Sequence, residues 1–242
     1  MSDATRRSFI ALASSALALP GEELWGKSFS YAPQVAGIQL PRTARCVGAY
    51  ELCRTAAPAF LLNHSLRTYV FGALHAAHHG QAFDAETAFI AAILHDLGLL
   101  QAFASAHGSF EVDGADRAEH WAREHGAPEG EASKVWNAIV MHDMRFSIAS
   151  HQSPEATLVA AGAGADVVGP DPDMIDAGRV REVVAAFPRL QFKTQFIALL
   201  ADHCHRKPGA QTGTWLEGFC RGHSSIPDSG TEQAIRAAPF AE

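Results

Sequence analysis

The chain has 242 residues, of which 48% are hydrophobic and 19% are charged, and its formal net charge is −7. This length and composition are typical of one globular domain of ordinary to large size, and they exclude an intrinsically disordered chain. The negative charge and the scattered basic residues disfavour nucleic-acid binding, so a small molecule is the expected partner. The 13 histidines favour a metal site.

The N-terminal segment has the layout of an export signal. Arg6 and Arg7 precede an apolar run that Pro20 ends, with a small-x-small cleavage pattern at 16–18. The arginine pair resembles a twin-arginine signal, so we predict a signal peptide at 1–19 and a periplasmic or otherwise exported protein. The alternative is a plain N-terminal arm on a cytoplasmic protein. The apolar run is too short to span a bilayer, and we expect no membrane association of the mature form.

Helical patterns dominate the rest of the chain, bounded by capping residues, prolines and glycines. A linker or N-terminal arm is expected at 20–42, a glycine-containing loop at 101–114, and a loose polar tail at 223–242. No convincing strand pattern is present, so the predicted fold class is all-α, with one helical domain at 43–222. The expected helices span 43–56, 58–79, 84–94, 116–125, 128–144, 154–168, 176–187, 190–206 and 213–222.

The four cysteines form no CxxC motif. Cys46 and Cys53 lie seven residues apart in one expected helix, about 10 Å along its axis, which is too far for a disulfide. We interpret all four cysteines, the others being Cys204 and Cys220, as buried free thiols.

An adjacent histidine and aspartate, His95 and Asp96, end the apolar helix expected at 84–94. Burying this carboxylate is costly unless it is paired or binds a metal. His64 lies in an apolar helical segment, and Asp166 lies among small residues flanked by valines. Each residue taken alone is more often a satisfied core side chain. Together they form a set of imidazoles and carboxylates that suits a divalent transition metal (Zn, Fe, Mn, Co or Ni) better than Ca or Mg.

These four residues resemble the metal-binding pattern of the HD superfamily of helical metal-dependent hydrolases. The neighbouring sequences look like the cyanamide hydratase branch: NHSLRTY at 63–69, HDLG at 95–98, FEVDGA at 110–115 and VWNAIVMH at 135–142. The resemblance covers most of the expected domain. It implies an HD-domain helical bundle with a metal held by His64, His95, Asp96 and Asp166.

Four further side chains are predicted to act in catalysis. Glu111 and Asp113 lie in the expected loop beside the HD pair, where they are candidates for acid–base work; the alternative is that they are solvated or cap the next helix. Arg67 is placed to meet a polar substrate group, or to pair with Asp96 in a structural role. His142 lies on the inward face of its helix, where we expect it to line the site as a metal ligand or a hydrogen-bond partner.

The expected reaction is attack by a metal-activated water on a small substrate. In the cyanamide hydratase interpretation the water attacks a nitrile carbon and the product is urea. The alternative is an HD phosphohydrolase acting on a nucleotide or another phosphoester, which needs cationic side chains. Basic residues near the motifs are few (Arg67, Lys134 and Arg145), which favours an uncharged substrate. A ligand-sensing HD domain without catalysis is a third interpretation, disfavoured by the intact ligand set, and a homo-oligomer is left open.

Overall fold

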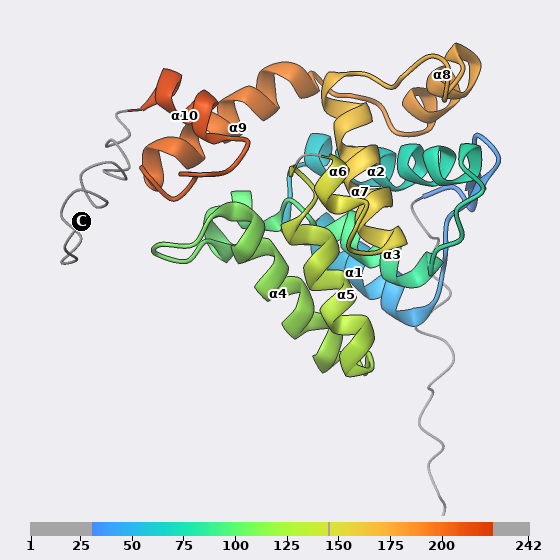
Figure 1. Ribbon diagram of the computed structural model, residues 1–242, viewed down its shortest axis with the longest axis horizontal. Coiled ribbons are helices and arrows are strands. Elements are labelled where there is room, and N and C mark those ends of the chain that lie inside the picture. Colours follow the sequence, from blue (N-terminus) through green and yellow to red (C-terminus); the bar gives the residue numbers. More distant parts are fainter. Residues whose placement is uncertain (1–30, 145, 225–242) are drawn as a thin grey trace, which may run out of the picture. The chain divides into compact units, whose positions relative to one another are not determined.

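The computed structural model describes residues 31–144 and 146–224, and these fold almost entirely into helices (Figure 1). A short antiparallel pair of strands, β1 (Gln34–Val35) and β2 (Ile38–Gln39), precedes them. Two 3₁₀ turns, η1 (Leu97–Leu99) and η2 (Gln101–Phe103), follow the third helix. The helices are α1 (Ala44–Ala56), α2 (Ala59–His78), α3 (Ala85–Leu94), α4 (Phe110–Glu124), α5 (Glu129–Val140), α6 (Phe146–Ala149), α7 (Pro154–Val168), α8 (Ala177–Ala186), α9 (Phe192–Arg206) and α10 (Glu217–His223).

The predicted all-α fold class is confirmed. The one strand pair is confined to a two-residue ladder ahead of the helices. No helix in the described ranges is long and apolar enough to cross a membrane. The predicted signal peptide at 1–19 lies outside the described residues.

Side-chain caps set most helix starts where local sequence predicts them. The side chains of Thr43, Asp84, Ser153 and Asp176 accept hydrogen bonds from backbone N–H groups in the first turns of α1, α3, α7 and α8. A cap of this kind satisfies a donor that the helix itself leaves unpaired. These four boundaries therefore depend on neighbouring residues only, and the structure agrees with the predicted starts.

The predicted loop at 101–114 is wrong in its second part, because α4 begins at Phe110. Ser109 caps this helix, its hydroxyl accepting from the backbone of Val112. Gly114, which belonged to the predicted loop, lies inside α4 where that helix approaches the end of α3. A Cβ atom on Gly114 would lie 3.0 Å from the carbonyl oxygen of His95. The glycine therefore permits a close contact between two helices and does not end one.

Helix α2 packs against both α3 and α7, and its contact with α7 is the most extensive between helices of the described residues. A Cβ atom on Gly162 of α7 would lie 1.9 Å from the carbonyl oxygen of Thr68 in α2. Only glycine lets the two backbones approach this closely. The crossing brings residues of α2 and α7 that are about 100 positions apart in sequence, such as His64 and Asp166, into direct contact.

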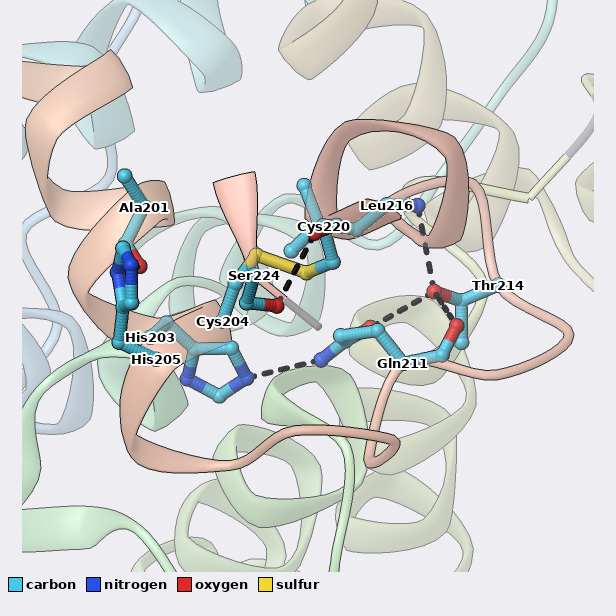
Figure 2. The surroundings of a disulfide bond; sticks show 9 residues. All are labelled: Ala201, His203, Cys204, His205, Gln211, Thr214, Leu216, Cys220 and Ser224. Atoms are coloured by element: carbon cyan, nitrogen blue, oxygen red, sulfur yellow. Dashed lines mark hydrogen bonds between the residues drawn. A yellow bond between two sulfur atoms is a disulfide. The ribbon is translucent and has the colours of Figure 1, made fainter. Parts of the chain in front are cut away.

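A disulfide between Cys204 and Cys220 joins α9 to α10 (Figure 2). The prediction of four free thiols is therefore wrong for this pair, while Cys46 and Cys53 are free and buried as expected. The two bonded cysteines lie in different helices, so their proximity depends on how the chain turns between them. Both belong to an apolar cluster that also holds Phe196 and Leu200 of α9.

Candidate metal centre

Three predicted ligands, His64, His95 and Asp96, converge where the end of α3 meets α2. Each offers one ligand atom, and these atoms all lie within 4.8 Å of one another. His64 Nε2 lies 3.2 Å from His95 Nε2 and 3.4 Å from Asp96 Oδ2. His95 Nε2 lies 3.2 Å from the same Asp96 oxygen. All three side chains are almost fully buried, so the group is shielded from bulk water.

Hydrogen bonds orient both imidazoles toward a common point. His64 Nδ1 donates to Asp166 Oδ2 at 2.7 Å, and His95 Nδ1 donates to the carbonyl oxygen of Ala92 at 2.8 Å. Because a carboxylate and a carbonyl only accept, each ring in its neutral form carries its proton on Nδ1 and presents an Nε2 lone pair. Asp96 Oδ2 is buried and makes no hydrogen bond within the described chain. Two lone pairs and an unsatisfied carboxylate oxygen facing one another fit a cation between them.

The electrostatics of the group favour positive charge at the same point. Burial by itself would raise the pKa of Asp96, but the imidazoles of His95 and His64 hold that pKa well below its usual range. Burial by itself would lower the pKa of His64, but the carboxylates of Asp166 and Asp96 raise it. Asp96 is thus an anion that attracts either a proton on a neighbouring ring or a metal ion in its place.

The structure places Asp166 behind His64, away from the shared point. Its Oδ2 accepts from His64 Nδ1, while Arg67 donates to both carboxylate oxygens at 2.7 and 2.8 Å. Arg189 Nη1 donates to Oδ1 at 2.7 Å. Burial would raise the pKa of Asp166, but His64 and Arg67 hold it far below its usual range. In this arrangement the carboxylate orients His64, and its predicted role as a direct metal ligand stays a prediction.

Two residues predicted to be catalytic are held by partners outside the cavity. Arg67 is fully buried and pairs with Asp166, not with Asp96 as the structural alternative assumed. Asp113 accepts from Lys207 Nζ at 2.5 Å and from the backbone of Ser105 at 3.0 Å. Neither side chain lines the cavity described below. The structure therefore gives both residues stabilising contacts, and their catalytic roles stay predictions.

His142, at the end of α5, lies at the edge of the metal centre. Its Nδ1 donates to the carbonyl oxygen of Ile139 at 2.6 Å, which leaves Nε2 facing Asp96 Oδ1 at 3.7 Å. Burial and the nearby His95 lower the pKa of His142 to about 4, so the ring is neutral at pH 7. A neutral imidazole with an open Nε2 is suited to be a further metal ligand or to accept a hydrogen bond from bound water.

A pair of carboxyl groups, Glu111 and Asp143, lies beside His142. Burial, and then the neighbouring Asp143 carboxyl, raise the pKa of Glu111 to about 8. Glu111 is therefore protonated at neutral pH and able to donate a proton, as its predicted role requires. Glu111 does not line the cavity, whereas the neighbouring Asp143 does.

Sequence reasoning missed Asp143, although a signal was present. His142 and Asp143 form a second His–Asp dipeptide at the end of a helix, as His95 and Asp96 do at the end of α3. Burial raises the pKa of Asp143.

A cavity of about 630 Å³ opens from the metal centre. One end of it is polar, and small residues of α7, including Ala163 and Gly164, leave the space that it occupies. No lysine or arginine lines it among the described residues. The polar end is formed by His64, His95, Asp96, His142 and Asp143.

Comparison with protein families identifies this region. The model of the HD domain matches residues 61–161, which hold His64, His95, Asp96 and His142. The chain thus contains an HD domain, and the converging histidines and aspartate fit the metal site of such a domain. No curated protein matches the chain, so the resemblance to cyanamide hydratases stays a prediction.

Proposed function

We propose that the protein is a metal-dependent hydrolase or hydratase whose metal is held by His64, His95 and Asp96. The observation that carries this proposal is the convergence of two Nε2 lone pairs on a buried, unbonded Asp96 oxygen at the end of a cavity. A divalent ion bound there supplies Lewis acidity and lowers the pKa of a water molecule. The surrounding side chains orient the ligands and supply the proton.

The neighbouring residues divide the remaining tasks. Asp166 and the carbonyl of Ala92 hold the two imidazoles in the orientation that a ligand needs. His142 accepts a hydrogen bond at the edge of the centre. Glu111, protonated at neutral pH, passes a proton through Asp143 to the substrate.

An uncharged substrate suits this site better than a phosphoester. Stabilising the developing charge of a phosphoryl group calls for cationic side chains or a second metal. The nearby cations Arg67 and Arg189 are engaged by Asp166, and Lys207 is engaged by Asp113. We therefore propose water addition to a nitrile, as in the conversion of cyanamide to urea. The water oxygen bonds to the nitrile carbon and becomes the carbonyl oxygen. Both C–N π bonds are lost, one C–O π bond forms, and the two protons of the water end on the nitrogen.

Metal analysis combined with a substrate panel tests the proposal. Wild-type protein purified without chelator is expected to retain at least one equivalent of a transition metal, and His95→Ala is expected to lose it. His120→Ala is the matched control, because that histidine is exposed and pairs with Glu124. The panel compares cyanamide and other nitriles with nucleotides and a phosphodiester.

Each outcome of the substrate panel has a defined interpretation. Urea or amide formation that requires the metal supports the proposal in full. Phosphate release without turnover of any nitrile would support the metal centre and show that the substrate is a phosphoester, not a nitrile. Wild-type protein that neither retains nor responds to any divalent metal would overturn the metal centre itself.

A further inference from the structure

The cavity beside the metal centre is much larger than a molecule such as cyanamide requires. Its volume of about 630 Å³ lies in the range of sites that enclose drug-sized ligands. A substrate of a few atoms would leave most of this space to water. The size of the cavity therefore points to a ligand with a substantial body beyond its reacting group.

The deep wall of the cavity is apolar. Phe110 of α4 and the α9 residues Phe196 and Leu200 line it, and all three are at most 7% exposed. Met144, which follows α5, and Val167 of α7 extend the apolar surface. Such a surface offers no hydrogen bonds to a polar ligand, and it gains free energy when it is covered by an apolar one.

Exposed hydrophobic side chains gather at the same cavity. Ile148, Val168 and Trp215 are 40%, 82% and 54% exposed, and all three line it. The other large exposed hydrophobic residues of the described chain, Leu190 and Ile197, do not line it. Exposed apolar surface concentrated at one opening is typical of a binding site.

Polar groups lie almost wholly at the metal end. Outside that end, the polar side-chain groups of the lining residues are the indole N–H of Trp215 and the hydroxyl of Thr214. The hydroxyl already bonds Gln211 and the backbone of Leu216. With no lysine or arginine in the described lining, an anionic ligand has no cationic side chain to pair with. The lining thus matches a molecule with one polar reacting group and an apolar remainder.

Building on the hydratase function proposed above, we propose that the substrate is an apolar nitrile with an aryl or alkyl body, and that Trp215, Val168 and Ile148 bind that body. The nitrile carbon lies at the metal end and is hydrated to the amide as described. Trp215 determines specificity, because it presents the largest apolar surface at the opening.

Calorimetric titration of the full chain with 4-phenylbutyronitrile and with cyanamide tests this inference without depending on turnover. We expect the aryl nitrile to bind at least tenfold more tightly than cyanamide. Trp215→Ala is expected to weaken its binding about tenfold, the scale of truncating a central aromatic contact. Val168→Ser, at a more exposed position, is expected to weaken it in the same direction. Ile197→Ala is the control, since this exposed residue lies outside the cavity, and should leave binding unchanged.

The outcomes separate this inference from the function on which it rests. Tight binding that depends on Trp215, without hydration of the nitrile, supports the apolar ligand and removes the nitrile chemistry. Turnover of cyanamide with no preference for the aryl nitrile, and no effect of Trp215→Ala or Val168→Ser, overturns the apolar ligand and leaves the proposed hydratase. Equal weakening by Ile197→Ala would also overturn it, because the effect would not be specific to the cavity.

Discussion

Removing the Cys204–Cys220 disulfide should weaken one wall of the cavity. The bond closes a loop between α9 and α10 that carries Gln211 (Figure 2). Trp215, which lines the cavity, belongs to the same loop. With its amide oriented to satisfy its neighbours, Gln211 accepts from His203 Nε2 and donates to Glu111 Oε1 at 3.2 Å. The loop therefore contributes both an apolar wall residue and a contact to the predicted proton donor.

The magnitude follows from the length of the closed loop. The two cysteines are 16 residues apart, which corresponds to about 3 kcal/mol of loop-closure entropy in the unfolded chain. For a protein of this size, each kcal/mol changes Tm by roughly 2–4 °C. Loss of the bond should therefore lower Tm by about 6–12 °C.

Calorimetry on the double variant Cys204→Ser/Cys220→Ser, and on wild-type protein with and without reductant, measures this effect. Reductant should lower the Tm of the wild type to that of the variant and leave the variant unchanged, which is the internal control. Thiol titration checks that the bond is present before reduction. An unchanged Tm after demonstrated reduction would refute the entropic argument, and four free thiols in protein never exposed to reductant would refute the disulfide.

Three further predictions concern the proton donor, the buried charge network and export. Glu111→Gln should lower kcat by ~10²-fold at neutral pH with metal content unchanged. Because the protonated form of Glu111 is the donor and its pKa is about 8, the wild-type rate should decrease above that pH, and the variant should lack this decrease. The same decrease in both proteins would exclude Glu111 as its cause. Arg67→Met should destabilise the protein by ~3–5 kcal/mol in urea unfolding, since it leaves the buried Asp166 short of a counter-charge, and a change under ~1 kcal/mol would show that Arg189 suffices. Export is consistent with the disulfide, because such bonds persist in oxidising compartments. N-terminal sequencing of protein from the native host should find a chain that begins near Leu19. A cytoplasmic chain that begins at Met1 would contradict the prediction.

The HD pair could be recognised from sequence because its signals are local. An apolar run of helical length that ends in His95 and Asp96 indicates a costly polar pair at a buried helix end, whatever surrounds it. The same holds for the helix starts at Thr43 and Ser153, where the capping side chain and the groups that it satisfies lie within three residues.

The position of Glu111 and Asp113 needed the tertiary structure. Considered by its own propensity alone, Gly114 disfavours a helix. In the folded chain the free energy gained where α4 meets the end of α3 outweighs that propensity, and both acids enter the first turn of a helix. One then lies beside Asp143 and the other pairs with Lys207, contacts to residues far along the chain.

By itself, the sequence determined the all-α class, most helix boundaries and the buried pair His95 and Asp96, since each of these depends on spacing within one helix or on adjacent residues. Only the tertiary structure decided which side chains from different helices pair with one another. Asp166 faces Arg67 and His64 because α2 crosses α7 at Gly162, and Cys204 meets Cys220 because the chain turns between α9 and α10. Such pairings depend on the free energy of packing whole helices against one another. That free energy involves residues from several segments at once, so it cannot be inferred from any one segment of the sequence.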